Sequence, residues 1–368
     1  MENHKICFFN RSSIHYRQNI YRLMDQELPC DFYFGDSRPG KIEPIPDGLL
    51  EHVKKPLHNV QIGPFYWQKG ALSLLRSDYT DLLTPGEPYC LSTWVIILLS
   101  RLFRKNVFTW THGAYGDEKR LKKWMTVWKI RHLKGCFLYG EYARQILTGW
   151  GVPAEKLHVV FNSLNYDAQL PLRKSLVETD FYRDHFGNGN PNLVFIGRLT
   201  TVKKLDQILL AASILKGQGT PYNVTFVGDG PAKARLTEMV GELGLEGTVW
   251  FYGACYDERQ IADFLYNADL CVSPGNVGLT AMHAMSFGCP VISHNHFSKQ
   301  MPEFEAIEAG KTGDFFREDD VADLAAVIAR WQAFGTDRET VRQACYRVID
   351  ERYNPHVQIE IFKKVING

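Results

Sequence analysis

The stretch from Ala268 to His294 constrains the fold of this chain more than any other feature of its sequence. The apolar runs at 270–272 and 290–293 predict two strands, and residues 278–286 between them have helical character. A strand, a loop, a helix and a second strand in so short a stretch form a compact βαβ unit. Such units are typical of α/β proteins.

The loop of this unit is rich in small residues at the point where its helix begins. Gly275 and Gly278 carry no Cβ, so a ligand can approach the backbone closely there. The first N–H groups of a helix and the positive end of its dipole favour a phosphate. We expect the unit to hold the diphosphate and the sugar of an activated donor.

The alternation of apolar strands and amphipathic helices occurs twice along the chain. The first series covers residues 1–166 and the second covers residues 193–354. The segment 167–192 ends in the polar sequence GNGNPN, which is typical of a linker. We expect a final helix, about 355–368, to pack back on the first domain. The pattern predicts an α/β protein with two doubly wound, Rossmann-like domains that face a central cleft, and the strands' carboxyl ends would place ligands there.

The composition excludes several classes of protein. With 368 residues the chain is too long for a single ordinary core, which agrees with two domains. Its net charge of +1 argues against a nucleic-acid partner. The eight cysteines show no C-x-x-C spacing, and several lie in apolar runs. We therefore expect reduced cysteines, with neither a disulfide framework nor a zinc site.

No stretch of the sequence predicts a signal peptide or a membrane-spanning helix. The first residues, MENHKICFF, lead directly into an apolar strand without a cleavable apolar region. The longest apolar run, 94–99 with its flanks, is far shorter than the ~20 residues that span a bilayer. We expect a cytoplasmic protein, either in solution or at the inner face of the membrane.

Residues 119–134 predict a basic helix that carries Trp124 and Trp128. Such a helix can lie on an anionic membrane surface and would give the protein a peripheral membrane contact. Alternatively, the helix packs its aromatic side chains on a sheet and leaves its lysines in water. The sequence leaves both alternatives open.

Two groups of polar residues in the first half follow predicted strands. His15, Tyr16 and Arg17 lie where the first helix begins, and His112 lies just after the strand 107–109. Open α/β sheets bind ligands at the carboxyl ends of their strands, so we expect both groups to contact substrates. The alternatives are surface residues of a helix and a histidine whose hydrogen bonds are satisfied within a loop.

Two cations lie in one loop of the second half. Arg198 and Lys203 follow the strand 193–196, and Gly197 between strand and loop allows a tight turn. An arginine can bind phosphate oxygens bidentately and a lysine acts as a point charge, so the pair suits a diphosphate. The alternative is a solvated basic loop. The small-residue helix start at Gly278, in the same predicted sheet, favours the phosphate site.

These motifs resemble the retaining glycosyltransferases of family four, which have the GT-B fold. The second half is similar to their donor domain through GRLTTVKK at 197–204, VGDGP at 227–231, FYGAC at 251–255 and GLTAMHAMSFGCPVI at 278–292. The first half resembles their acceptor domain more loosely, through WTHG at 110–113 and FNSL at 161–164. The resemblance is specific for the fold and for a nucleotide-activated sugar, and not for which sugar.

The resemblance implies roles for individual residues. Arg198 and Lys203, with the backbone N–H groups of Leu279 and Thr280, would hold the diphosphate and stabilise its developing charge. The residues implied to contact the nucleoside or the base are Gly228, Asp229, Gly230, Tyr252 and Gly253. His112 would contact the donor sugar near the reacting carbon, and His15, Tyr16 and Arg17 would contact the acceptor. No metal and no cofactor are implied, and we favour a UDP-sugar over a GDP-sugar as the substrate.

The sequence departs from the family at two positions. The family usually has two glutamates eight positions apart across this loop and helix, and here those positions are Gly275 and His283. A neutral imidazole at His283 could bind the ribose in place of the second glutamate. Gly275 has no side chain to contact the sugar, and Asn276 or a backbone N–H is the candidate replacement.

The leading hypothesis is a retaining, metal-independent glycosyltransferase of the hexosyl type. It would move a sugar from a nucleotide diphosphate to a lipid-linked saccharide acceptor in the synthesis of a surface polysaccharide or glycan. One alternative is a non-catalytic nucleotide-sugar-binding subunit that acts through a partner transferase. A nucleotide-sugar epimerase of the same fold is a further alternative, although it would need carboxylates in the cleft that the sequence does not place.

Overall fold

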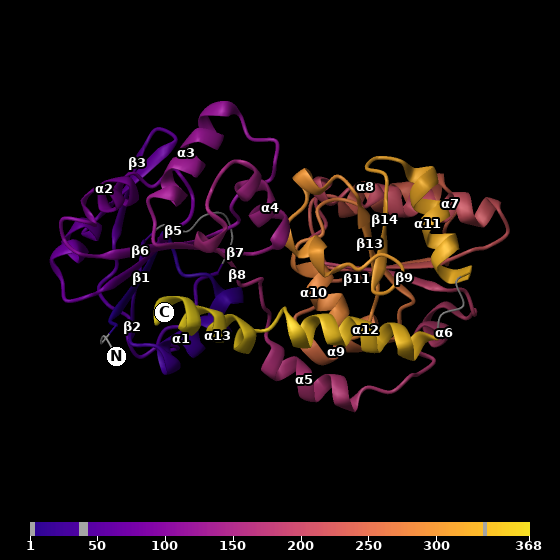
Figure 1. Cartoon of the computed structure of the whole chain (residues 1–368). Helices are drawn as coiled ribbons and strands as arrows, with labels where there is room; N and C mark the ends of the chain where they lie inside the picture. The colour runs from indigo at the N-terminus through magenta and orange to yellow at the C-terminus, as the bar shows by residue number, and fades with distance from the viewer. Residues whose placement is uncertain (1–3, 37–42, 334–336) are drawn as a thin grey trace. The chain divides into compact units, whose positions relative to one another are not determined.

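The protein is described by a computed structural model that covers residues 4–36, 43–333 and 337–368. The chain divides into two compact units (Figure 1). Met1–Leu164 and Arg352–Gly368 form the first unit, and Asn165–Glu351 forms the second. Both units are α/β folds, and each has a core of its own.

A parallel sheet of six strands forms the centre of the first unit, in the order β2-β1-β5-β6-β7-β8. Its strands are β1 (Ile6–Asn10), β2 (Cys30–Phe34), β5 (Asp81–Pro85), β6 (Asn106–Thr111), β7 (Gly135–Leu138) and β8 (Leu157–Val159). The chain moves outward from β1 to β2 and then returns past β1 to β5, so the strand order reverses between these neighbours. Such a switch point opens a crevice outside the carboxyl ends of the strands.

Both faces of this sheet are buried because its strands alternate large apolar side chains. Phe8 lies in a core with Phe362, whereas the next residue, Phe9, lies in a core with Ile96. The helices on the Phe8 side are α1 (Gln18–Glu27) and α13 (Pro355–Ile366), which lie side by side in Figure 1. Those on the other side are α2 (Leu91–Leu99), α3 (Arg120–Arg131) and α4 (Glu141–Gly149). The last helix of the chain therefore belongs to the first unit.

An antiparallel hairpin lies between β2 and β5. It consists of β3 (His58–Ile62) and β4 (Phe65–Lys69), joined through Gly63 at φ 57°. The sequence pattern predicts irregular structure over 36–66 and a short helix over 67–76. The hairpin shows that the first prediction is wrong over 58–62, whereas the short helix is confirmed in part, as the 3₁₀ helix η2 (Ala71–Arg76) that follows β4. β3 is largely exposed and carries no apolar alternation, so nothing in its pattern indicates a strand. The stretch 37–42 lies outside the described residues.

The second unit is built on another parallel sheet of six strands, in the order β11-β10-β9-β12-β13-β14. The strands are β9 (Asn192–Ile196), β10 (Asn223–Val227), β11 (Val249–Gly253), β12 (Leu270–Ser273), β13 (Val291–His294) and β14 (Gly313–Phe316). The order runs outward from β9 to β11 and then returns to the other side of β9 with β12. The switch point of this sheet therefore lies between β9 and β12.

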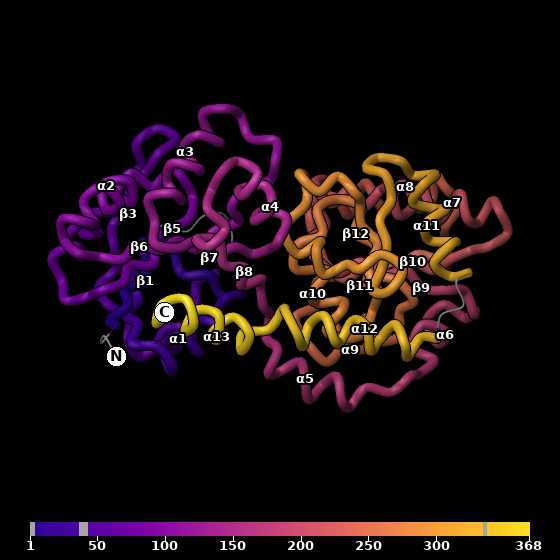
Figure 2. Tube along the Cα trace, in the orientation of Figure 1, coloured from indigo at the N-terminus to yellow at the C-terminus, as the bar shows by residue number. Residues whose placement is uncertain are grey.

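Helices cover both faces of this sheet, as the trace in Figure 2 shows. One layer consists of α7 (Asp206–Gly217), α8 (Lys233–Glu242) and α11 (Val321–Ala333), whose apolar residues form a core with Leu193 and Phe195 of β9. The opposite layer contains α9 (Glu258–Asn267), α10 (Leu279–Ser286) and α12 (Arg338–Glu351). α5 (Tyr166–Ser175) and α6 (Phe181–Phe186) pack on α9 in this layer.

The segment 167–192, predicted as a linker, lies within the second unit. Gln169 Nε2 donates to Glu258 Oε1 at 2.7 Å, and Arg173 forms two hydrogen bonds to Asp350, at 2.9 and 3.0 Å. The hydroxyl of Tyr182 donates to the backbone oxygen of Phe264 at 2.8 Å. The boundary between the units therefore follows Leu164 and not residue 192, and residues 352–354 belong to the first unit. Polar composition indicated a linker because these anchors are single side chains spread over two short helices.

α3 differs from a uniformly basic helix. Lys129 is buried, and its Nζ donates to the backbone oxygens of Pro85, Gly86 and Glu87 at 2.8, 3.0 and 3.3 Å. Trp128 stacks on Trp94 of α2, with ring centroids 5.1 Å apart. The second half of α3 therefore packs against α2 and the end of β5. Within the ranges 4–36, 43–333 and 337–368, no helix is both long enough and apolar enough to cross a membrane.

Burial of Lys129 predicts a pH-dependent contribution to stability. Burial lowers the pKa of Lys129 to about 8, and Glu87 offsets this only in part. Between this value and the usual lysine pKa of about 10.4, the unfolded chain binds more protons than the folded one, so stability rises with pH. We expect the unfolding free energy of the wild type, relative to Lys129→Met, to rise by about 2 kcal/mol from pH 8 to pH 10.

Denaturant unfolding across this pH range measures the effect. Lys134→Met is the control, because Lys134 is an exposed lysine a few residues further along the chain. The relative stability of this control should not change with pH. A flat difference between the wild type and Lys129→Met would contradict the prediction.

Candidate functional site

The switch point of the second unit brings together most of the residues predicted to bind the donor. The loop after β9 carries Gly197, Arg198 and Lys203, and the loop after β12 carries Asn276 and leads into α10. Since both loops follow the carboxyl ends of neighbouring parallel strands, they lie at one edge of the sheet.

The loops after β9 and β10 lie with backbone directly against backbone. The N–H of Gly197 donates to Val227 O at 3.0 Å, and the N–H of Leu199 donates to Asp229 O at 3.0 Å. A Cβ on Gly228 would overlap the carbonyl of Gly197, and a Cβ on Gly230 would overlap that of Leu199. The glycines of the 227–231 motif are therefore required by packing, which leaves their predicted contact with a nucleoside untested.

Lys203 connects the loop after β9 with the loop after β12. Its Nζ donates to the backbone oxygen of Asn276 at 2.6 Å and to its side-chain oxygen at 2.9 Å. Burial lowers the pKa of Lys203, and the nearby carboxyl group of Glu303 opposes this effect. The half-buried amine can therefore hold an anion in a poorly hydrated position.

Gly275 lies where the family that the sequence resembles usually has a glutamate, and its surroundings explain the difference. Its N–H donates to Lys203 O at 3.0 Å, and a Cβ on it would overlap the backbone of Val202 and Lys203. The loop after β12 has thus closed onto the loop after β9 in a way that excludes any side chain at this position.

The start of α10 is fixed by a bond from its own Thr280 to β9 and by the side chain of Gln300, which lies in a loop after β13. Gly278 precedes the helix with φ 53°, and the hydroxyl of Thr280 donates to Ile196 O at the end of β9, at 3.2 Å. The N–H of Val277 donates to Gln300 Oε1 at 2.8 Å. Leu279 and Thr280 are the first two residues of the helix, so their backbone N–H groups lie at the positive end of its dipole. Both residues remain partly exposed.

Arg198 is exposed, and in the described part of the chain it makes no hydrogen bond or ion pair. Asp229 accepts a hydrogen bond from the N–H of Gly230 at 2.7 Å, which orders the turn after β10. Arg198 is therefore the cation of this edge that remains available to a ligand.

The residues predicted to lie near the base are at the end of β11. Tyr252 is 37% exposed, packs against Phe264 with ring centroids 4.7 Å apart, and donates through its hydroxyl to Gln260 at 2.7 Å. Gly253 adopts φ 98°, and its carbonyl accepts from the N–H of Gly228 at 2.7 Å. The three successive loops after β9, β10 and β11 are thus joined by backbone hydrogen bonds.

A carboxylate that the sequence pattern does not indicate lies beside His283. His283 Nε2 donates to Glu258 Oε1 at 3.0 Å, and Gln169 donates to the same oxygen. Burial alone would raise the pKa of Glu258, but the bonds from His283 and Gln169 outweigh it and lower the pKa. Asp257 caps α9 by accepting from the N–H of Gln260 at 3.0 Å, and this cap was the sequence signal that places Glu258 at a helix start.

His112 lies just after β6 in the first unit. Its Nδ1 is 3.1 Å from the hydroxyl of Tyr115, and its ring packs edge-on against Tyr139 with centroids 4.7 Å apart. Loss of hydration, reinforced by the positive charge of Arg17, lowers the pKa of His112 to about 4. The imidazole is therefore neutral at physiological pH.

The predicted acceptor residues occupy a short 3₁₀ helix, η1 (His15–Arg17), that precedes α1. His15 is exposed, and its ring packs edge-on against that of Tyr16, with centroids 5.7 Å apart. Arg17 turns toward the sheet, where its guanidinium lies 4.8 Å from the centroid of Trp110. The structure thus places Arg17 with His112, and leaves His15 at the surface.

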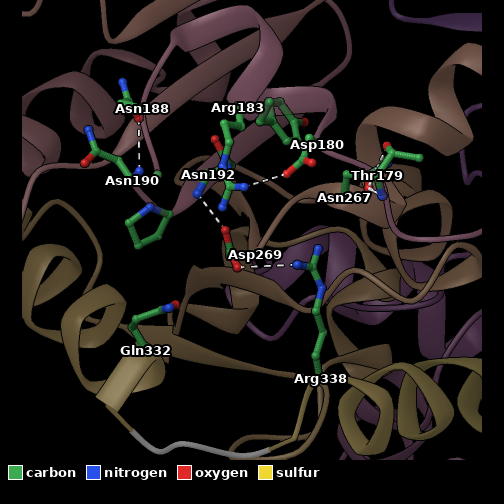
Figure 3. Close-up of a pocket in the computed structure, with 13 residues that line it drawn as sticks. Thr179, Asp180, Arg183, Asn188, Asn190, Asn192, Asn267, Asp269, Gln332 and Arg338 are labelled. Atoms are coloured by element: carbon green, nitrogen blue, oxygen red, sulfur yellow. Dashed lines mark hydrogen bonds and ion pairs between the residues drawn. The ribbon is translucent and has the colours of Figure 1, made fainter.

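A polar cavity of about 240 Å³ lies elsewhere in the second unit (Figure 3). Asn192 begins β9, and Asn267 and Asp269 precede β12, so this cavity is at the amino-terminal edge of the sheet. Asp269 accepts from the N–H of Asn192 at 2.7 Å and lies 3.7 Å from Arg338. None of the predicted donor residues lines this cavity.

Two further predictions remain open. Leu121 and Trp124, in the first half of α3, are 69% and 59% exposed and lie beside several lysines. A membrane contact of residues 119–134 therefore stays a prediction, and it now concerns only the first half of this helix.

Among the described residues, no three His, Cys, Asp or Glu side chains lie close enough together to hold a metal ion.

Solved structures with the same architecture extend over the whole chain. The structure of Anabaena HepE in complex with UDP superposes with a TM-score of 0.72 at 16% identity, and covers 99% of this chain and 100% of that one. The lipopolysaccharide outer core galactosyltransferase WaaB gives the same TM-score at 15% identity and covers 99% of each chain. The chain therefore has the GT-B fold.

The sequence of the second unit resembles a known family. Residues 178–348, a little under half of the chain, match the family of glycosyl transferases group 1. It is 28% identical over 221 residues to the amylovoran biosynthesis glycosyltransferase AmsK of Erwinia amylovora, and 29% over 154 residues to WcaL of Salmonella typhimurium, named for colanic acid biosynthesis. The matches cover 57% and 39% of this chain, and they span 50% and 37% of these relatives.

The packing of Gly275 predicts that restoring the family's acidic residue will harm the protein. We expect Gly275→Ala to cost about 1–3 kcal/mol of stability, because its Cβ must displace the backbone that carries Lys203. Gly275→Glu should cost at least as much.

Thermal unfolding measures both changes. Gly217→Ala is the matched control, since a Cβ there meets open space. A Gly275→Glu variant as stable as the wild type would show that the loop is more adaptable than its packing indicates.

Proposed function

We propose that this protein is a glycosyltransferase that moves a sugar from a nucleotide diphosphate to a saccharide acceptor. The observation that carries the proposal is the edge of the second sheet at β9 and β12. There the unpaired Arg198, the half-buried Lys203 and the start of α10 converge within a domain of the group 1 glycosyltransferase family.

Each of these groups suits a leaving diphosphate. As the bond between the sugar carbon and the phosphate oxygen breaks, negative charge develops on the diphosphate. Lys203 and Arg198 would stabilise this charge with the N–H groups of Leu279 and Thr280. Charge-assisted hydrogen bonds contribute about 1.5–3 kcal/mol each, so their loss is measurable in turnover.

Retention of configuration and independence from a metal are part of the proposal. The acceptor hydroxyl would attack from the face that the leaving phosphate occupies and would pass its proton to a phosphate oxygen. This route needs no pair of carboxylates of the glycosidase kind. The cations at Arg198 and Lys203 would take the part that a magnesium ion plays in other transferases. His112, a neutral imidazole, would hydrogen-bond the donor sugar.

For the donor we propose a hexose carried by UDP, because HepE was solved with UDP and with UDP-glucose. A relative named for GDP-mannose makes the guanine nucleotide the first competitor. For the acceptor we propose a lipid-linked saccharide that is used in the synthesis of a surface polysaccharide. The relatives AmsK and WcaL, named for amylovoran and colanic acid biosynthesis, support a role in biosynthesis of this kind. Such an acceptor would place the protein in the cytoplasm, at the inner face of the membrane.

A second candidate function is a non-catalytic subunit that binds a nucleotide sugar. It is favoured by Gly275, where no side chain fits and the family's usual sugar contact is absent. Release of free nucleotide distinguishes the two functions, because a binding subunit would retain the donor intact.

Turnover tests the role of Lys203. With a panel of UDP- and GDP-sugars and a crude lipid acceptor fraction, the wild type should release free nucleotide from one donor. We expect Lys203→Ala to lower this rate roughly a hundredfold, as loss of one preorganised charge-stabilising group does in other enzymes.

Lys311→Ala is the control, a largely exposed lysine of the same unit, and its rate should equal that of the wild type. A folded Lys203→Ala variant with unchanged turnover would overturn the phosphate role. If the wild type binds a donor and never releases nucleotide, the binding-subunit function replaces the enzyme.

We further propose that His283 and Glu258 bind the ribose together. His283 lies about one helical turn inside α10, roughly 6 Å beyond the N–H groups that would hold the diphosphate. Glu258 brings a carboxylate to this position from α9, so its free oxygen could accept from a ribose hydroxyl. The carboxylate missing at His283 would thus come from a neighbouring helix.

Deoxynucleotides test this assignment. We expect wild-type protein to bind UDP about tenfold more tightly than 2′-deoxy-UDP or 3′-deoxy-UDP, since a hydrogen bond to a charged group is lost. Glu258→Gln should weaken UDP binding and remove most of this difference, whereas Glu246→Gln, at an exposed site, should change neither. Equal discrimination in Glu258→Gln and the wild type, measured by calorimetry, would refute the assignment.

A further inference from the structure

Among the described residues of the first unit, the positively charged guanidinium of Arg17 has no negatively charged partner. Its guanidinium lies over aromatic rings, 4.8 Å from the centroid of Trp110, 5.2 Å from that of Tyr139 and 5.9 Å from that of Tyr16. Within the described ranges, no carboxylate pairs with it. Removing a charge from water without a counter-charge is costly, and aromatic faces compensate only part of that cost.

Two of the unsatisfied groups around Arg17 can only donate, whereas the nearby hydroxyl of Tyr21, also unsatisfied, can donate or accept. The Nε–H of Arg17 and the indole Nε1–H of Trp110 are both buried without a hydrogen-bond partner, and Trp110 is only 5% exposed. Buried donors normally find an acceptor. A cation beside unpaired donors is complementary to an anion that is rich in acceptors.

The position of the cluster is that of a ligand site. Arg17 follows β1, Trp110 lies near the end of β6, and Tyr139 directly follows β7, so all three gather at the carboxyl edge of the sheet. Tyr139 stacks on Trp110 at 5.6 Å and also contacts the ring of His112. Arg17 is partly exposed as a residue, while its Nε–H is buried.

We propose that Arg17 binds a phosphoryl group at this edge of the first unit. A planar guanidinium held on aromatic rings presents its N–H edge to two oxygens at once, which suits a phosphate ester or a diphosphate. The choice of phosphate over another anion rests on the proposed function. Two sources share this chemistry: the diphosphate of the donor, and the diphosphate of a lipid-linked acceptor.

The test measures binding of two probes by the full chain. Farnesyl diphosphate, with uncharged farnesol as its counterpart, stands for the lipid source, and UDP stands for the donor. Arg17→Gln removes the charge, Arg17→Lys keeps the charge but removes the bidentate edge, and Arg22→Gln is a control at an exposed arginine of α1.

We expect the wild type to bind farnesyl diphosphate at least tenfold more tightly than farnesol. Arg17→Gln should abolish this preference, with a loss of about ten- to hundredfold, and Arg17→Lys should lose part of it. Arg22→Gln should keep it. A loss confined to farnesyl diphosphate would identify the acceptor as the source, and a loss confined to UDP would identify the donor.

Both outcomes support the phosphoryl site, whereas unchanged affinities for both probes in Arg17→Gln would overturn it. If Arg17→Gln does not fold, Arg17→Lys decides: affinities equal to those of the wild type for both probes would also overturn the proposal. Failure of the wild type to bind any nucleotide would instead contradict the proposed function. Farnesyl diphosphate would still decide the role of Arg17 in that case.

Discussion

The bond from Lys203 Nζ to Asn276 holds together the part of the molecule on which the functional account depends. It joins the loops that follow β9 and β12, the two strands between which the order of the second sheet reverses. The N–H of Gly275 returns a backbone bond to Lys203 O, and the two loops touch without an intervening side chain. Because the switch point fixes these loops, the start of α10 and the lysine amine are positioned before any ligand arrives.

This arrangement also explains how the chain departs from the family that it resembles. A glutamate at Gly275 would collide with the backbone that carries Lys203, so the missing acid is a consequence of close loop packing. At His283 the situation is different, because a carboxylate is present nearby and comes from Glu258 on α9. One acidic position has therefore been lost and the other has an acidic neighbour in space, which a comparison of motifs position by position does not detect.

Much of this could be predicted from the sequence because the signals are local. The apolar runs of the buried strands and the glycines at Gly228 and Gly278 predicted the alternation and the loops correctly, and the fold class followed. The failures have physical causes. The hairpin β3–β4 is too exposed to show apolar alternation, and α5 and α6 are anchored by single side chains such as Arg173 that composition does not reveal. The buried Lys129 and the contact of Glu258 with His283 depend on distant packing.

A crystal structure of the full chain with UDP tests the central claim most directly. The account predicts the diphosphate at the carboxyl edge of the second sheet, with its oxygens within hydrogen-bond distance of Lys203 Nζ and of the N–H groups of Leu279 and Thr280. Lys203 would then share or give up its bond to Asn276. A diphosphate bound at the opposite edge, in the polar cavity beside Asn192 and Arg338, would contradict the account.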